Sequence, residues 1–408
     1  MILTDTRIIK PHNELYTELD NLCFLSKNLY NSTLFVARKS FLLKNYRNYN
    51  SINKEFTHSH QPDYRALPAK VAKQTQMLVD KNFKSFFALC KEKKEGGNSA
   101  IKKVRLPNYL HKVEGRQVVV YPKDALSFAK DGYIRLSKTN VFIKNFVDKK
   151  DVRQVRIVPC GGYIKIEILY KKECKKNVET QKYAAIDLGI DNLATLISTE
   201  FSPVVINGKP AKSINRFYNK LIAQEKSTIA PTGRTKSVKL SNMWRRRKTR
   251  LDDYLHKSSR YIVNHLVNHS ISHLIVGYNK GWKQDTKMGK VNNQRFVHMP
   301  FQRFVEMLIY KCALEGITVV LQEESYTSKS SFFDGDPLPV YGKAKQPVFT
   351  GERIKRGLYK TGEGRLVNAD INGSLNILRK YANKSGVWSA DMQQNLTSHS
   401  HNPAKITV

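Results

Sequence analysis

The chain has 408 residues, of which 70 are Lys or Arg and 34 are Asp or Glu, so its formal net charge at pH 7 is +36. Such a charge destabilises a compact protein by self-repulsion unless a polyanion offsets it, and nucleic acid is the polyanion we expect. The sequence has no apolar stretch long enough to span a bilayer and no signal peptide, and its five scattered cysteines form no C-x-x-C pair. These features exclude a disulfide framework and argue against a membrane protein and a cysteine zinc site.

The N-terminal part is predicted to be a β-barrel split by helices. Residues 1–12 alternate between apolar and polar side chains and predict the first strand. Residues 13–100 form a helical module, with helices near 13–43 and 68–94 and a polar loop at 44–62 between them. Residues 101–178 contain short alternating strands separated by Gly, Asp and Pro, which are typical of a small barrel or sandwich.

Residues 179–324 alternate between strands and helices, which predicts an α/β domain. Its first strand lies in the stretch 183–195, where Asp187 stands inside an apolar run. A long helix at 240–272 begins with many basic residues and ends with an apolar stripe. Its candidate phosphate contacts, for which ordinary solvated charge is the alternative, are Arg245, Arg246, Arg247, Lys248, Arg250, Lys257 and Arg260.

The C-terminal part is predicted to be mostly irregular. Residues 325–366 are loop-rich and basic, and their candidate substrate contacts are Lys329, Arg353, Lys355, Arg356 and Lys360. Residues 367–382 contain the last helix of the α/β domain. Residues 383–408 have little apolar content, which predicts a disordered tail.

Four carboxylates stand where strands end or helices begin, namely Asp187, Glu323, Glu324 and Asp370. In a parallel α/β sheet these positions meet at one edge, where ligands bind. Three converging carboxylates would form an oxygen cage for one or two Mg²⁺ ions, and a pair of such ions hydrolyses phosphodiesters. Taken singly, Asp187 could instead be a strand-end residue that caps a turn, Asp370 a helix N-cap, and Glu323 and Glu324 a solvated strand end.

Three segments of the sequence, YAAIDLGIDNLAT, SYTSK and RGLYKTGEGRLVNADINGSLNILRK, resemble the TnpB family of transposon-encoded, OrfB-type proteins. The resemblance covers residues 183–381, and it implies a RuvC-like nuclease domain of RNase H topology behind a wedge barrel with a helical recognition module. It also implies RNA-guided, Mg²⁺-dependent cleavage of double-stranded target DNA, a guide RNA derived from the transposon end, and a cytoplasmic, nucleoid-associated protein of prokaryotic or phage origin. Monomer and homodimer both remain open.

Residue by residue, Asp187 matches the first catalytic aspartate of the family and Asp370 the last. The glutamate that most members carry at the end of the strand 273–278 is replaced by Gly277, so the resemblance points to Glu324, or else Glu323, as its substitute. No zinc is expected, because the family's two C-x-x-C pairs are missing. Asp334 and Asp336 could replace the zinc by hydrogen bonds or turn caps, or have no specific role. The missing glutamate also leaves open a nuclease-inactive, repressor-like RNA-guided DNA-binding protein.

Overall fold

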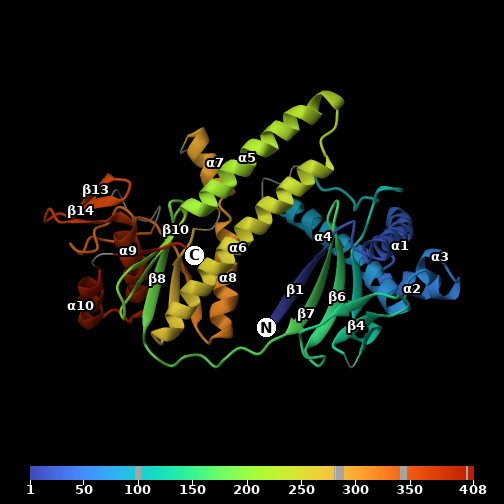
Figure 1. Ribbon diagram of the computed structural model, residues 1–408, viewed down its shortest axis with the longest axis horizontal. Coiled ribbons are helices and arrows are strands. Elements are labelled where there is room, and N and C mark those ends of the chain that lie inside the picture. The colour runs from blue at the N-terminus through green and yellow to red at the C-terminus, as the bar shows by residue number, and fades with distance from the viewer. Residues whose placement is uncertain (97–102, 130, 280, 282–288, 341–346, 401–402) are drawn as a thin grey trace. The chain divides into compact units, whose positions relative to one another are not determined.

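The computed structural model describes residues 1–96, 103–129, 131–279, 281, 289–340, 347–400 and 403–408 (Figure 1). The chain divides into two compact units, Met1–Lys172 and Glu173–Val408. Within the described residues, none of the helices combines the length and the apolar character that a bilayer-spanning segment needs.

The first unit is built on a four-stranded antiparallel sheet in the order β1-β7-β6-β2. Its strands are β1 (Ile2–Ile9), β2 (Val119–Pro122), β6 (Val152–Pro159) and β7 (Ile164–Lys171). Although β1 opens the chain, it pairs with β7 along its whole length, from Ile2 opposite Lys171 to Ile9 opposite Ile164. A second antiparallel sheet contains β3 (Leu126–Phe128), β4 (Tyr133–Leu136) and β5 (Phe142–Lys144), and a short 3₁₀ turn at Lys123–Ala125 precedes it.

Four helices stand between β1 and β2 in the sequence: α1 (Tyr16–Leu42), α2 (Tyr49–His58), α3 (Pro62–Arg65) and α4 (Ala69–Lys94). The predicted loop at 44–62 was therefore wrong, because α2 occupies most of it. Asn48 caps α2 by accepting from the Ser51 N–H, and Ile52 and Phe56 are buried at helical spacing. No pairing joins β1 to β2 in the described part of the unit, so closure of the sheet into a barrel stays a prediction.

The second unit contains a six-stranded mixed sheet in the order β12-β11-β8-β9-β10-β16. Its strands are β8 (Tyr183–Leu188), β9 (Asn192–Ser198), β10 (Val204–Asn207), β11 (His273–Gly277), β12 (Thr318–Gln322) and β16 (Ala404–Ile406). β9 runs antiparallel to both of its neighbours, whereas β11 and β12 run parallel to β8. A three-stranded meander followed by two parallel strands beyond β8 is the RNase H topology, which confirms the predicted α/β, RuvC-like class.

Two long helices, α5 (Lys209–Ile229) and α6 (Val238–Asn268), follow the meander and form the hairpin seen in Figure 1, with a 3₁₀ turn at Ala230–Thr232 between them. The far half of the hairpin has its own small core of Tyr218, Ile222 and Leu240. The C-terminal half of α6, including Leu255 and Leu266, belongs to the main core. The change from basic to apolar residues along α6 therefore marks where the helix reaches the sheet.

The remaining helices are α7 (Lys290–His298), α8 (Phe301–Leu314), α9 (Ala369–Ser385) and α10 (Ala390–His399). Ahead of α9, the region predicted to be loop-rich contains a three-stranded antiparallel sheet of β13 (Glu352–Lys355), β14 (Leu358–Lys360) and β15 (Leu366–Asn368). The predictions that fall on residues 97–102, 130, 280, 282–288, 341–346 and 401–402 lie outside the described residues.

The predicted disordered tail at 383–408 was wrong. Ser389 caps α10 by accepting from the Met392 N–H, and Met392 and Leu396 are buried in the cluster that also contains Leu375 and Leu378 of α9. β16 then pairs in parallel with β10, with Ala404 opposite Val204. Two buried side chains and one short strand are enough to hold this segment, although its mean composition is polar.

We expect Leu396→Ala to lower the free energy of unfolding of the second unit by about 2–4 kcal/mol, because the side chain is fully enclosed and its removal leaves a cavity. Thermal unfolding would measure the change. Gln394→Ala, an exposed position on the same helix, is the control and should change stability by less than about 0.5 kcal/mol. Equal behaviour of the two variants would contradict the packing of α10.

Candidate active site

The candidate site lies at the carboxyl end of β8, where α9 crosses the sheet. Asp187 is the fifth residue of β8 and lies opposite Thr195 of β9. At this point α9 comes so close that a Cβ added to Gly373 would lie 3.0 Å from Asp187 Oδ2. A larger residue at this position of α9 would press on the carboxylate, so the glycine allows the close approach of the helix.

Asp370 belongs to the first turn of α9 but does not cap the helix. The cap is Asn368, whose side chain accepts from the backbone N–H groups of Asp370 (2.9 Å) and Ile371 (3.2 Å). The Asp370 carboxylate is thus left for the site, where it accepts hydrogen bonds from Asn192 Nδ2 (2.7 Å) and Arg353 (3.3 Å).

Gly277 leaves the space that the Glu324 carboxylate fills. β11 ends at Gly277, opposite Gln322 of β12, and Glu324 follows two residues later. A Cβ built on Gly277 would overlap Glu324 Oε1 and would also lie 2.5 Å from Ile377 Cδ1. The carboxylate of Glu324, which follows β12, therefore reaches the end of β11, and its role as the substitute glutamate stays a prediction.

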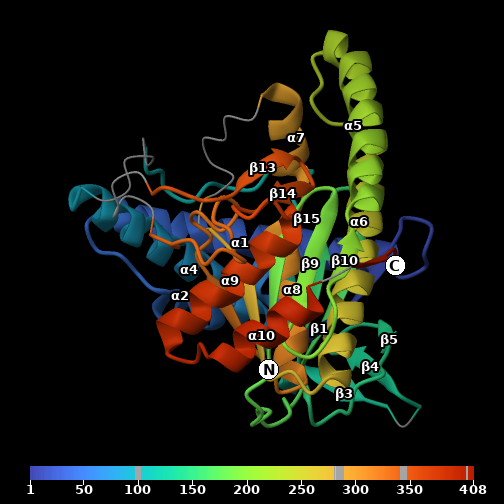
Figure 2. The same ribbon diagram turned by 90° about the vertical axis from the view of Figure 1, so that its left-hand side faces the viewer.

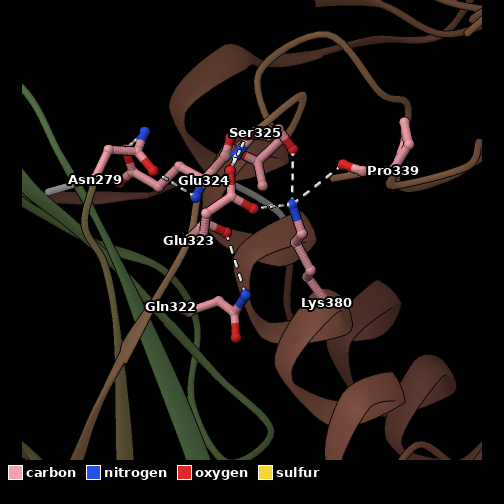
Figure 3. A network of polar contacts seen from close by, with 8 residues as sticks. Asn279, Gln322, Glu323, Glu324, Ser325, Pro339 and Lys380 are labelled. Carbon is pink, nitrogen blue, oxygen red and sulfur yellow. Dashed lines mark hydrogen bonds and ion pairs between the residues drawn. The ribbon is translucent and has the colours of Figure 1, made fainter. Parts of the chain in front are cut away.

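The two adjacent glutamates have different partners, as Figure 3 shows. Glu323 forms an ion pair with Lys380 Nζ (2.6 Å) and accepts from the backbone N–H (2.7 Å) and the hydroxyl of Ser325. Among the described residues, Glu324 accepts a long hydrogen bond from Asn279 Nδ2 (3.4 Å), and no partner is found there for its buried Oε1. Its backbone N–H donates to Asn279 Oδ1 (3.0 Å). The unsatisfied carboxylate oxygen belongs to Glu324, and Glu323 is held by Lys380.

The electrostatics of the site show that two carboxylates share a desolvated space. Burial raises the pKa of Asp187 to about 7; the charge of Asp370 adds to the increase, and Arg353 opposes it. Burial also raises the pKa of Glu324 to about 8, and the charges of Asp187 and Glu323 add to that increase. Groups that repel each other in this way are typical of sites that receive a cation.

The donor set fits a hard divalent cation, since it consists of carboxylate oxygens and includes an orphaned one. Among the described residues, no group of three His, Cys, Asp or Glu side chains is arranged to hold a metal ion. The carboxylates therefore do not form a complete metal site in this structure. Arg353 is the nearest positive charge, and its guanidinium group occupies one oxygen of Asp370. Closing the set of Asp187, Glu324 and Asp370 would require this ion pair to open.

Polar side chains of α9 fix the segment that carries Glu324. Asn372 bonds to the backbone of Phe332 (3.0 Å) and Ser330 (2.9 Å), and one turn later Asn376 Nδ2 donates to the carbonyls of Thr327 (3.0 Å) and Ser330 (2.6 Å). All these groups are buried, so each bond satisfies a backbone group that water cannot reach. The SYTSK and NADINGSLNILRK motifs are therefore one structural unit.

The segment after SYTSK is held by carboxylates. Asp336 accepts from the backbone N–H of Ser331 (2.8 Å) and from the N–H (3.1 Å) and hydroxyl (2.8 Å) of Thr350. Asp334 accepts from the Gly362 N–H (2.7 Å). These bonds join parts of the chain up to 28 residues apart, which is the kind of link that we had expected of Asp334 and Asp336.

The structure shows that the predicted phosphate contacts differ in burial and in their ion pairs. Arg247 is not a surface contact: it is buried, and its guanidinium donates twice to Asn215 Oδ1 (2.9 and 2.7 Å). The others on α6 are Arg245, which is half-buried, and the exposed Arg246, Lys248, Arg250, Lys257 and Arg260. Of these, Lys248, Lys257 and Arg260 pair with Asp252, Asp253 and Glu315. Lys329, Arg353, Lys355, Arg356 and Lys360 are also exposed, and Arg356 pairs with Asp191 (3.1 Å).

Sequence reasoning missed the amides and the cation that orient the carboxylates, namely Asn192, Asn279 and Lys380. Asn192 is the first residue of β9, and Asn279 follows the end of β11. A position at a strand end is only a weak sequence signal that an amide orients a carboxylate. Lys380 is almost fully buried in the helix that carries Asp370. A lysine at such a position needs an anionic partner, and this requirement was the signal available in the sequence.

Two family profiles match parts of the chain. The profile OrfB_IS605, described as a probable transposase, matches residues 165–283, and the profile described as Cas12f1-like, TNB domain, matches residues 301–377. None of the curated proteins gives a match.

Among solved structures, the chain is similar to a Cas12f1–sgRNA–target DNA complex, with 13% identity, a TM-score of 0.36, and coverage of 92% of this chain and 98% of that chain. It is also similar to C2c1 of Alicyclobacillus acidoterrestris in complex with single-guide RNA, with 7% identity, a TM-score of 0.38, and coverage of 89% and 70%. At such low identities and scores, the fold is assigned from the strand order alone.

We expect Asp187→Asn to stabilise the metal-free protein at pH 8. The folded-state pKa of Asp187 (about 7) lies above the ordinary value of 3.8, so ionisation costs stability as the pH rises through this interval. Removing the charge should add roughly 1–3 kcal/mol at pH 8 and almost nothing at pH 4. Thermal unfolding in a chelator measures this. Asp253→Asn, at an exposed ion pair, is the control and should be neutral at both pH values.

We expect Gly277→Ala to destabilise the second unit by roughly 1–3 kcal/mol, because the new methyl group displaces Glu324 and Ile377. Gly357→Ala is the matched control, since an added Cβ there meets nothing within 4 Å and the residue has no left-handed φ. Thermal unfolding compares the two. A Gly277→Ala protein as stable as the control would contradict the contact between Gly277 and Glu324.

Proposed function

Because the chain belongs to the TnpB family of OrfB-type probable transposases, we propose that it is an RNA-guided, Mg²⁺-dependent DNA endonuclease of a transposable element. It would cut target DNA by RuvC-type hydrolysis of phosphodiester bonds. The observation that carries the proposal is the approach of Asp187, Glu324 and Asp370 at one edge of an RNase H-type sheet, with a buried oxygen of Glu324 unpartnered.

In this proposal Asp187, Glu324 and Asp370 hold the metal, as catalytic residues. Mg²⁺ ions bound there would activate water and stabilise the charge that develops on the phosphate. Asn279 orients Glu324 through its side-chain and backbone contacts, and Asn192 orients Asp370. Glu323 acts as a positioning residue, because its bonds to Lys380 and Ser325 fix the turn from which Glu324 projects.

The proposed partners are a guide RNA from the transposon end and double-stranded target DNA. The net charge of +36 supports a polyanionic partner. The exposed cations of α6 and of the β13–β14 hairpin are the proposed phosphate contacts, apart from the buried Arg247. Arg353 and Arg356 are the most direct of these, because both already pair with aspartates beside the site, Asp370 and Asp191.

The alternative, a nuclease-inactive RNA-guided DNA-binding protein, rested on the missing glutamate at position 277. It is less well supported, because the Glu324 carboxylate lies against the Cα of that residue, where a side chain would otherwise begin. The charges of Asp187 and Asp370 also act on one another, as do those of Asp187 and Glu324. A chain freed from selection for cleavage has no reason to keep repelling carboxylates together at a cost in stability.

The test is purification from a host that carries the flanking transposon end, sequencing of the co-purified RNA, and Mg²⁺-dependent cleavage of a plasmid with a matching target. We expect Asp187→Ala and Glu324→Gln to lose at least about 100-fold in cleavage rate while retaining the RNA, because each removes a metal ligand. Glu306→Gln, at an exposed position of α8, is the control and should cleave normally.

The outcomes separate the two functions. Bound RNA without cleavage by the unchanged protein, with target and adjacent motif supplied, would favour the inactive DNA-binding protein. Full activity of Glu324→Gln together with loss of activity in Glu323→Gln would move the ligand to Glu323. Absence of any bound RNA would contradict the guided function.

A further inference from the structure

The β13–β14 hairpin places a positive charge on the candidate metal site. The small sheet of β13, β14 and β15 lies beside the first turns of α9, and β15 leads directly into the helix (Figure 2). The Ala369 N–H donates to the Gly357 carbonyl (3.2 Å), which holds the turn of the hairpin next to Asp370. From this position Arg353 of β13 reaches Asp370 Oδ1 (3.3 Å).

A second ion pair holds the same hairpin. Arg356, in the turn between β13 and β14, pairs with Asp191 of the turn after β8 (3.1 Å). Arg353 Nε donates to the Arg356 carbonyl (3.1 Å). The Arg353 guanidinium is therefore positioned by its own hairpin as well as by Asp370.

The charge of Arg353 acts on two of the three proposed metal ligands. Its guanidinium pairs with Asp370, and its charge opposes the rise in the pKa of Asp187 that burial causes. For the third ligand, Glu324, the cation that opposes the rise in pKa is Lys380. Arg353 therefore already supplies to the two aspartates part of the positive charge that a metal ion would bring.

The contact between Arg353 and Asp370 is weak enough to open. In the described part of the unit β13 pairs only with β14, its four residues are exposed, and the register shifts between Arg353 and Lys355. The ion pair is itself partly exposed, with 38% of the Arg353 side chain and 26% of the Asp370 side chain accessible. Pairs of this kind contribute little to stability. Arg353 can therefore leave Asp370 while the sheet stays folded.

We propose that Arg353 is a built-in competitor of the metal ion. While Arg353 holds Asp370, the carboxylates bind a divalent cation weakly, and release of Arg353 completes the set of ligands. The inference rests on the proposed nuclease function and adds the regulation of its metal site. The coupling is reciprocal: an anion that takes the guanidinium raises the metal affinity, and a bound metal ion makes the guanidinium available to an anion.

The experiment measures Mn²⁺ binding to the full chain without nucleic acid, because RNA and DNA bind Mn²⁺ themselves. Electron paramagnetic resonance of free Mn²⁺ gives the binding isotherm, and Asp370→Asn identifies the part of it that belongs to this site. Arg353→Gln removes the competing charge, whereas Arg353→Lys retains it. Lys384→Gln, at an exposed position near the C-terminal end of α9, is the matched control because it removes an equal charge elsewhere.

We expect Arg353→Gln to bind Mn²⁺ at this site about tenfold more tightly than the unchanged protein, because the guanidinium no longer occupies Asp370. Arg353→Lys should stay within about threefold of the unchanged protein, since the positive charge remains. Lys384→Gln should change the affinity less than about twofold, because solvent and salt screen a distant exposed charge. Thermal unfolding in a chelator checks that each variant folds.

Equal or weaker Mn²⁺ binding by Arg353→Gln, with binding that still depends on Asp370, would overturn the competition and leave the metal site and the proposed function intact. An equal gain in Lys384→Gln would assign the effect to net charge and would also overturn the role of Arg353. Absence of any binding that depends on Asp370 would contradict the metal site, and with it both the competition and the proposed function. Because no nucleic acid is present, none of these results depends on cleavage.

Discussion

The second unit depends on holding carboxylates together that repel one another. Asp187 and Glu324 come from different strands of one sheet, and Asp370 comes from a helix that crosses it. Burial and mutual repulsion raise the pKa of the first two, so the folded state is less stable at neutral pH than a neutral site would make it. The packing of α9 offsets this cost. Nearly every residue of α9 from Ala369 to Lys380 is buried, and its amides bind the backbone of the segment that begins with Glu324.

The packing at the end of the sheet also lets the glutamate after β12 reach the end of β11. β11 and β12 are adjacent and parallel, so a side chain that starts just beyond β12 can reach the end of β11 if nothing blocks the way. Gly277 provides the opening, and Asn279 fixes the backbone of Glu324 from the same strand end. The Glu324 carboxylate therefore lies beside the end of β11, although its residue follows β12.

The sequence predicted the parts of the molecule that depend on regular patterns. The alternation of strands and helices gave the α/β class, and an aspartate inside an apolar run identified Asp187. What failed depends on a few contacts that composition does not show: Leu396 and Met392 hold α10, and α2 lies in a stretch that reads as polar. The Asn192–Asp370 bond joins residues 178 positions apart, so no local pattern could have predicted it. Arg247 was misassigned because charge along a helix does not show which face turns inward.

The distribution of positive charge around the site follows from the same electrostatics. Cations far from the carboxylates, such as Lys248 and Lys257, mostly pair with acids on their own helix and are worth little individually. Those at the sheet edge pair with aspartates in or next to the site: Arg353 with Asp370 of the site, and Arg356 and Lys212 with Asp191 in the turn after β8. In the free protein these cations reduce the repulsion among the carboxylates. A metal ion and a phosphodiester would supply cation and anion together, so each could replace one half of these ion pairs. Once a metal ion neutralises the carboxylates, Arg353, Arg356 and Lys212 would be free to bind the phosphates of the strand.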